Sequence, residues 1–244
     1  MLVANWMSSR LISILPDDSL PQANKVMRQN SIRRLPVIDK KGRLVGIVSD
    51  RDLKRAWASD ATTLEVHELA YLLGKVKVKE IMTKAPAIIG PDDTIEEAAQ
   101  IMLEKNISGL PVVNREGAVV AMLTQSDIFR ALVLLTGVTS GGVQFAFNLP
   151  DEAGSIKRVA DVIRRYGGRM VSILSSSDRT APSRRQVFIR MKNVDRSKLE
   201  QIRDELTPSG ELVYILDGSG PSKRLLFTEA PGRPAAPAGA AASR

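Results

Sequence analysis

The chain carries the stretch PDDSLPQANKVMRQNSIRRLPVIDKKGRLVGIVSDRDLKRA at residues 16–56 and repeats it, without a gap, as PDDTIEEAAQIMLEKNISGLPVVNREGAVVAMLTQSDIFRA at residues 91–131. Pro16 aligns with Pro91, and 14 of the 41 aligned positions are identical, Asp52 and Asp127 among them. Self-similarity at a fixed spacing is the signature of a duplicated structural unit. We therefore expect the part of the chain up to about position 135 to be two copies of one fold.

Each copy predicts the same order of elements. A short apolar segment precedes a helix, and Ser19 and Thr94 begin these helices with the pattern of a capping box. Two strands joined by a turn at Gly42 or Gly117 follow, and a second helix closes the copy. The strands are apolar throughout, which indicates that both faces are covered. They are predicted at 35–38 and 44–48 in the first copy and at 110–113 and 119–123 in the second.

Residues 142–217 follow a different pattern. They predict a strand at 143–149, a helix at 155–166, strands at 170–175 and 186–191, a helix at 196–206 and a strand at 212–216. This βαββαβ order is that of a ferredoxin-like split unit. The overall class is therefore α/β, or α+β. The Pro- and Ala-rich residues 221–244 cannot bury a core, and we expect them to be disordered.

Composition excludes several classes of protein. The chain has no cysteine and a single histidine, His67, in a predicted connecting helix. Zinc–thiolate sites, iron–sulfur clusters and cysteine nucleophiles are therefore excluded, as is a multi-histidine metal site. No phosphate-binding loop or serine-hydrolase motif is present. We predict no catalytic residue, no metal site and no enzymatic activity.

Charge and hydropathy bear on location and partners. The formal net charge is +8, which keeps open a nucleic-acid partner, although no basic helix with interleaved aromatic residues accompanies it. The most apolar stretch, 131–135, is far too short to span a membrane. The opening residues 1–6 lack the pattern of an export signal. We therefore expect a cytoplasmic protein without a membrane partner.

The repeated motif resembles the CBS (cystathionine-β-synthase) motif. The residues that carry the resemblance are Ile32-Arg33-Arg34-Leu35-Pro36-Val37 with 46–53, and Ile107-Ser108-Gly109-Leu110-Pro111-Val112 with 121–128. Two such motifs resemble a tandem CBS pair, or Bateman module, over about residues 5–135. The resemblance implies two αβ units about a pseudo-twofold axis. It also implies two clefts between them that hold an adenosine compound.

Particular residues suit this ligand. Asp52 and Asp127 follow a strand and open a helix, where a carboxylate can accept hydrogen bonds from both ribose hydroxyls. Slightly earlier in the chain, Ser49 and Thr124 can donate to a phosphate beside the amides of the helix start. The alternative is that these four residues only cap their helices. The other predicted nucleotide-binding residues are Ile12, Ile14, Arg33, Arg34, Pro36, Arg51, Ile88, Gly109 and Pro111.

The two copies differ in charge. Arg33, Arg34 and Arg51 of the first motif correspond to Ser108, Gly109 and Ser126 of the second. Guanidinium groups suit phosphate, which favours the first motif for a phosphorylated ligand. Because the clefts of the family lie between the repeats, an arginine could instead reach a phosphate held by the other motif.

The stretch Leu149–Ser155 before the first helix of the C-terminal third resembles an ACT domain, an amino-acid-sensing module. The resemblance implies a dimer and an amino-acid site at Asp151, Gly154 and Ser155, where amides at the helix start suit a carboxylate. The family often has an asparagine after this helix, where Gly168 and Arg169 stand here. A purely dimerising role therefore stays open.

The order CBS–CBS–ACT resembles the acetoin-utilisation regulator (AcuB-like) family. We predict a first CBS domain at 1–62, a linker helix and second CBS domain at 63–136, an ACT domain at 137–220 and a tail at 221–244.

The predicted function is that of a homodimeric, non-catalytic ligand sensor. Its regulatory ligand is AMP, ADP or ATP, with S-adenosylmethionine as a further candidate. It requires no cofactor and acts on a regulated protein that the sequence does not identify. The alternatives are a basic nucleic-acid-binding regulator and a dimerisation scaffold with empty clefts.

Overall fold

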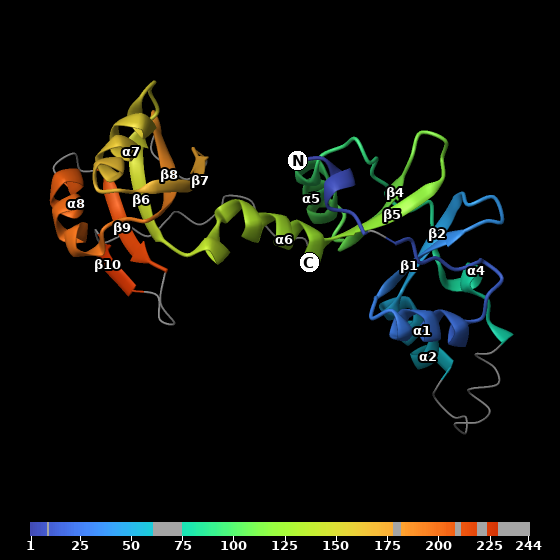
Figure 1. Cartoon of the computed structure of the whole chain (residues 1–244). Helices are drawn as coiled ribbons and strands as arrows, with labels where there is room; N and C mark the ends of the chain where they lie inside the picture. Colours follow the sequence, from blue (N-terminus) through green and yellow to red (C-terminus); the bar gives the residue numbers. More distant parts are fainter. Residues whose placement is uncertain (9, 61–74, 178–181, 208–210, 219–223, 229–244) are drawn as a thin grey trace. The chain divides into compact units, whose positions relative to one another are not determined.

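The computed structural model describes residues 1–8, 10–60, 75–177, 182–207, 211–218 and 224–228. The chain divides into two compact units, Met1–Ala131 and Leu132–Arg244 (Figure 1). The described part of the first unit has two hydrophobic cores and that of the second has one. The predicted connecting helix around His67 lies outside the described residues.

The first unit follows the predicted order of elements in both copies. Thr94 opens its helix with a capping box, since its Oγ1 accepts from Glu97 N (3.2 Å) and its N donates to the Glu97 carboxylate (2.8 Å). Each strand pair is antiparallel and has an irregularity at the same place, after Val37 and after Val112. The first copy contains α1 (Leu20–Gln29), β1 (Arg34–Ile38), β2 (Leu44–Ser49) and α2 (Asp50–Asp60). The second contains α5 (Ile95–Glu104), β4 (Gly109–Val113), β5 (Val119–Thr124) and α6 (Gln125–Thr136), which continues into the second unit.

The segments that lead into the two copies are exchanged between them. Val3, in η1 (Val3–Asn5), is fully buried in the core of the second copy, and its N donates to Asp93 O (2.8 Å). Val78, in α4 (Val78–Ile81), is fully buried in the core of the first copy, and its N donates to Asp18 O (2.9 Å). The two contacts are equivalent, because the alignment of the repeats also places Val3 on Val78. Each core therefore includes a residue from the segment that leads into the other copy, and the bounds 1–62 and 63–136 stay a prediction.

The exchange continues along the strands. The short strand β3 (Thr83–Lys84) pairs with β2 of the first copy, and Ser8 N donates to Met122 O (2.9 Å) in the second. At Gly46 a Cβ atom would lie 2.5 Å from Met82 Sδ and 2.9 Å from Thr83 O. Glycine at this position therefore permits the close approach of β3.

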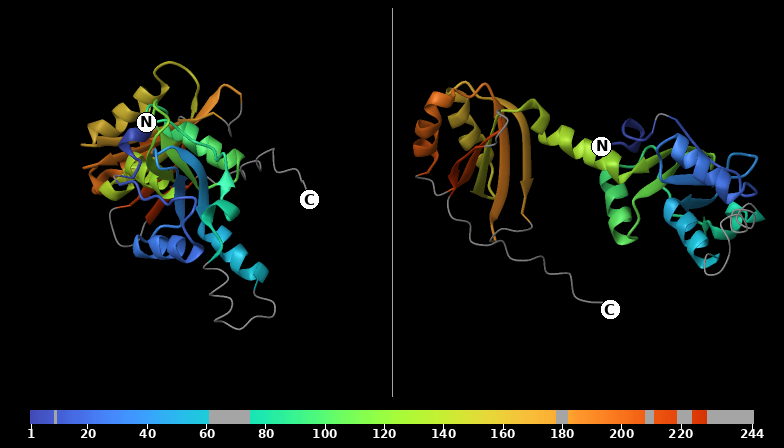
Figure 2. Two further views of the ribbon diagram at one scale, coloured as in Figure 1. Left: turned by 90° about the vertical axis from the view of Figure 1, so that its right-hand side faces the viewer. Right: turned by 90° about the horizontal axis from the view of Figure 1, so that it is seen from below.

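The second unit is a five-stranded antiparallel sheet in the order β10-β9-β6-β8-β7, with α7 and α8 on one face (Figures 1 and 2). The core lies between that face and the helices, and includes Phe145, Phe147, Ile163 and Ile202. The elements are η2 (Val138–Ser140), β6 (Val143–Pro150), α7 (Ser155–Arg165), β7 (Arg169–Ser176), β8 (Arg184–Lys192), η3 (Arg196–Lys198), α8 (Leu199–Leu206), β9 (Leu212–Asp217) and β10 (Arg224–Thr228). The predicted βαββαβ order is therefore present.

Strand β10 differs from the sequence-based expectation. Residues 224–228 fall in the tail that composition predicts to be disordered, but they pair antiparallel with β9 in a register that joins Leu225 to Leu216. The run Leu225-Leu226-Phe227 is apolar and suits a strand, unlike the Pro- and Ala-rich sequence after it. Among the described residues, no helix is long and apolar enough to cross a bilayer.

The exchanged packing of the first unit can be tested by truncating a buried side chain. Val3→Ala should lower the free energy of unfolding by about 2 kcal/mol, because it leaves a cavity in the core of the other copy. Leu2→Ala is the matched control, since Leu2 is 47% exposed and should contribute much less. Urea denaturation measures both variants. An equal loss of unfolding free energy in the two variants would contradict the packing of Val3 in the core of the other copy.

Candidate functional site

In the described part of the first unit, two clefts are each lined by residues of both copies. The first cleft has a volume of about 600 Å³ and the second about 580 Å³. The first is lined by Arg34, Ile47, Ser49, Arg51, Asp52, Arg55, Thr83, Ala85, Pro86, Ala87, Lys105, Asn106, Ile107, Ser108 and Gly109. The second is lined by Ser8, Arg10, Ile12, Ser31, Ile32, Arg33, Arg34, Met122, Thr124, Ser126, Asp127 and Arg130.

In the first cleft a capping box fixes the carboxylate of Asp52. Its Oδ2 accepts from Ser49 N (2.8 Å) and Ser49 Oγ (2.6 Å), and Asp52 N donates back to Ser49 Oγ (3.3 Å). These bonds engage one oxygen of the carboxylate, which can accept hydrogen bonds at both oxygens. The capping role given above as the alternative is therefore present, and it is compatible with binding a ligand.

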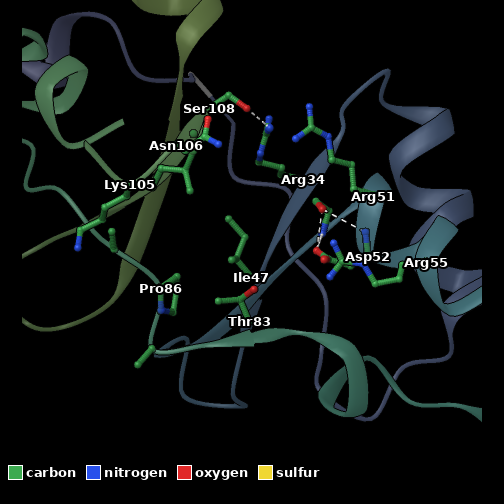
Figure 3. A pocket seen from close by; sticks show the side chains of 15 residues that line it. Arg34, Ile47, Arg51, Asp52, Arg55, Thr83, Pro86, Lys105, Asn106 and Ser108 are labelled. Atoms are coloured by element: carbon green, nitrogen blue, oxygen red, sulfur yellow. Dashed lines mark hydrogen bonds between the residues drawn. The ribbon is translucent and has the colours of Figure 1, made fainter. Parts of the chain in front are cut away.

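The first cleft is strongly basic. Arg34, Arg51, Arg55 and Lys105 line it, and Asp52 is the one acidic residue among the described lining. Figure 3 shows Asp52 and the arginines on the wall formed by the first copy, with Lys105 on the wall formed by the second. Several cationic side chains around one carboxylate suit a ligand that carries phosphate.

Arg34 belongs to both clefts. Its guanidinium donates to Ser108 Oγ of the other copy (Figure 3). The side chain lines both the first and the second cleft. Burial lowers the pKa of Arg34; Asp50 opposes this shift, and the neighbouring Arg51 and Arg33 add to it. An anionic ligand would relieve this crowding of positive charge.

The second cleft repeats the geometry around Asp127. Its Oδ2 accepts from Thr124 N (2.7 Å) and Thr124 Oγ1 (2.6 Å). Its Oδ1 pairs with Arg130, and Asp127 is only 6% exposed. Arg55 occupies the corresponding place in the first copy, and no described contact pairs it with Asp52. The acidic side chain of the second cleft is thus more engaged than that of the first.

The structure brings most of the predicted residues to the clefts. Ser49, Arg51, Asp52, Arg34 and Gly109 line the first, and Ile12, Arg33, Arg34, Thr124 and Asp127 line the second. Arg33 therefore lies with the motif of the other copy, as the family resemblance allowed. The charge difference between the clefts is correspondingly small, since Arg10, Arg33, Arg34 and Arg130 surround the second.

Four predicted residues do not line either cleft. Ile14 is buried in the first core, and Pro36 and Pro111 are buried in their strands. The carbonyl oxygen of Pro36 accepts from Ile14 N (3.1 Å), and that of Pro111 accepts from Ile89 N (3.1 Å). Ile88 is exposed outside the described lining. The apolar segments that contain Ile14 and Ile89 therefore pair in a strand-like way with β1 and β4.

In the segments between the first helix and first strand of each copy, the sequence predicted Arg33, Arg34 and Gly109 but not Ser31, Ile32, Asn106, Ile107 and Ser108. Residues 31–34 line the second cleft and the equivalent 106–109 line the first. Ser31 (φ 53°) and Asn106 (φ 50°) share a left-handed backbone at the start of these segments. Arg55 and Arg130 were also missed, although their identity in the two copies was a visible signal.

The predicted amino-acid loop lies in the second unit. Gly154, with φ 87°, is the N-cap residue of α7, and Ser155 is buried. Asp151 pairs with Arg185 (Oδ1 to Nε, 2.9 Å). These positions match the expected helix start, and an amino-acid ligand there stays a prediction.

Comparison with known proteins identifies the family of the first unit. The CBS domain family matches residues 3–59 and 78–134. A CBS domain-containing protein of Dictyostelium discoideum is 38% identical over 133 residues, which cover 54% of this chain and 92% of the relative. The chain therefore belongs to the CBS-domain proteins.

Two solved structures are similar to little more than half of the chain. One is CBSX2 of Arabidopsis thaliana in complex with AMP, with 31% identity, 54% of this chain and 96% of that chain covered, and a TM-score of 0.45. The other is a putative acetoin utilization protein (AcuB) from Vibrio cholerae, with 26% identity, 57% and 96% covered, and a TM-score of 0.48.

Proposed function

We propose that this protein is a non-catalytic sensor whose CBS clefts bind an adenine nucleotide, of the AMP, ADP or ATP class, or S-adenosylmethionine. The observation that carries the proposal is the pairing, in each cleft, of one carboxylate oriented by a helix cap with several arginines. The carboxylate suits a ribose diol and the guanidinium groups suit phosphate. The preference for adenine rests on membership of the CBS family.

The dimensions of the clefts support a ligand of this size. Small-molecule sites have volumes of about 300–1,000 Å³, and both clefts fall within this range. Each cleft also joins the two copies, so a bound nucleotide contacts both. Binding would therefore favour the arrangement of the copies that brings the phosphate and ribose contacts together.

The first cleft is proposed as the stronger site. Asp52 has an oxygen outside its capping box, whereas Asp127 also pairs with Arg130. A ligand diol at Asp127 must share or displace that contact. Because the Arg130 side chain is 70% exposed, the ion pair is weak and the second site remains accessible at higher ligand concentration.

The two clefts should be coupled through Arg34. This side chain lines both, and one guanidinium serves a phosphate in one cleft at a time. Occupancy of the first cleft would thus weaken binding in the second. A coupling free energy of roughly 1–3 kcal/mol is typical of such linkage.

We further propose that the protein is a cytoplasmic homodimer that acts on another protein. The exposed apolar side chains of α6, including Phe129 (60% exposed) and Leu134 (63% exposed), support an interface, because exposed apolar clusters mark contact surfaces. The second unit is proposed to be an ACT domain that dimerises or senses an amino acid at the loop of Asp151, Gly154 and Ser155.

Calorimetric titration with AMP, ADP, ATP and S-adenosylmethionine tests nucleotide binding. At least one should bind, and Asp52→Ala should weaken it by about tenfold or more, because the diol loses its acceptor. Asp17→Ala is the matched control: Asp17 is an exposed residue paired with Lys79 outside both clefts, and its loss should leave affinity unchanged. Absence of binding by all four compounds would favour a scaffold with empty clefts. Unchanged affinity in both Asp52→Ala and Asp127→Ala would contradict the assigned roles.

The shared position of Arg34 gives a second prediction. Arg34→Ala should weaken binding in both clefts. It should also make the affinity of the second cleft independent of whether the first cleft is occupied. Arg43→Ala, which alters an exposed arginine paired with Asp39, should do neither. Calorimetric titration with the nucleotide, fitted to a two-site model, measures both effects. Loss confined to one cleft would show that Arg34 does not couple them.

A further inference from the structure

The second unit has a cavity of its own on the sheet face that α7 and α8 leave uncovered. Val143, Phe145 and Phe147 of β6 point into the core, so Gln144 between them faces the other way. Arg190 of β8 likewise alternates with the core residues Ile189 and Met191. The cavity has a volume of about 320 Å³ and is closed on one side by the end of α6.

Arg190 is a buried cation in this cavity. The residue is 7% exposed, and its Nε donates to Thr136 O (2.9 Å) while a terminal nitrogen donates to Gln144 Oε1 (2.6 Å). Both acceptors are neutral, and among the described residues no carboxylate forms an ion pair with Arg190. Burial lowers its pKa, opposed only by Tyr214. A buried charge without a described counter-charge is costly, so an anion that reaches this cavity would be stabilised by Arg190.

A structural role for Arg190 accounts for only part of this arrangement. Thr136 is the last residue of α6, and its carbonyl also accepts from Ser172 Oγ (2.9 Å). The carbonyl end of a helix carries a partial negative charge of about half a unit, so it offsets the guanidinium incompletely. Arginine has five N–H donors, and the described bonds use two of them. Donors therefore remain for a carboxylate.

The rest of the lining is apolar. Leu132 and Val133 of α6, Val138, and Leu174 and Phe188 of the sheet surround the polar end, which consists of Arg190, Gln144, Thr136 and Ser172. A cation at one end of an apolar cavity fits a ligand with one negative charge and a short hydrocarbon tail. A phosphate ester with a sugar would leave its hydroxyls against these side chains without partners.

We propose that this cavity binds a small monocarboxylate with an apolar tail, whose carboxylate pairs with Arg190. The site lies on the sheet face opposite the helix whose start carries Gly154. It is therefore separate from the predicted amino-acid loop and from both CBS clefts. The second unit would then respond to an organic acid while the first responds to a nucleotide.

Titration of the full chain with 4-methylpentanoate and 3-phenylpropanoate tests this site, with 3-phenylpropanamide as the neutral probe. The acid with the better-fitting tail should bind saturably, about tenfold more tightly than the amide, and raise the melting temperature. Arg190→Gln should remove the preference for acid over amide. Arg164→Gln, which changes an exposed arginine on α7, should retain it.

A second variant keeps the test independent of the stability of Arg190→Gln. Leu174 is 37% exposed at the cavity, so Leu174→Trp should fold and fill the space. It should abolish binding of acid and amide and leave nucleotide titrations unchanged. Three results would overturn the proposal: no saturable binding of either acid at about 10 mM, equal affinity for acid and amide, or undiminished binding in Leu174→Trp.

Discussion

The first unit depends on the burial of Val3 and Val78, each in the core of the copy to which it does not belong by sequence. Neither copy can complete its apolar core alone, so the two must associate for either to be stable. This requirement holds β3 against β2 and Ser8 against β5. It also brings residues 106–109 to face Asp52 and residues 31–34 to face Asp127. The clefts are thus a consequence of the exchange.

Within the clefts, the same side chains stabilise the helices and offer contacts to a ligand. Ser49 and Thr124 cap their helices and hold a carboxylate in place, which reduces the entropy that a ligand would lose in ordering it. The arginines have few acidic partners, and Arg34 is crowded by other guanidinium groups. Arg190 of the second unit presents the same imbalance on a smaller scale. In both units the excess of positive charge is what points to an anionic ligand.

The elements could be predicted from the sequence better than their contacts. The duplication is visible because Leu-Pro-Val, glycine and aspartate recur at one constant spacing. The exchange of leading segments is not visible, because that spacing is the same whichever copy each segment packs against. Ile14 precedes the motif and Pro36 lies within it, which suggests a cleft, but Ile14 pairs with Val37 of β1 and is buried in the core, and Pro36 is buried within β1. Strand β10 is hidden by the composition of the tail around it, and a lone arginine in a strand, such as Arg190, has no distinctive pattern.

The crystal structure of the protein grown with AMP would test the central claim most directly. We expect electron density in the first cleft, with both ribose hydroxyls on the carboxylate of Asp52 and the phosphate near Arg34. The capping bonds from Ser49 should persist in that complex. Density at another place on the chain, or a cleft closed by neighbouring side chains with Asp52 turned away from it, would contradict the role assigned to this cleft.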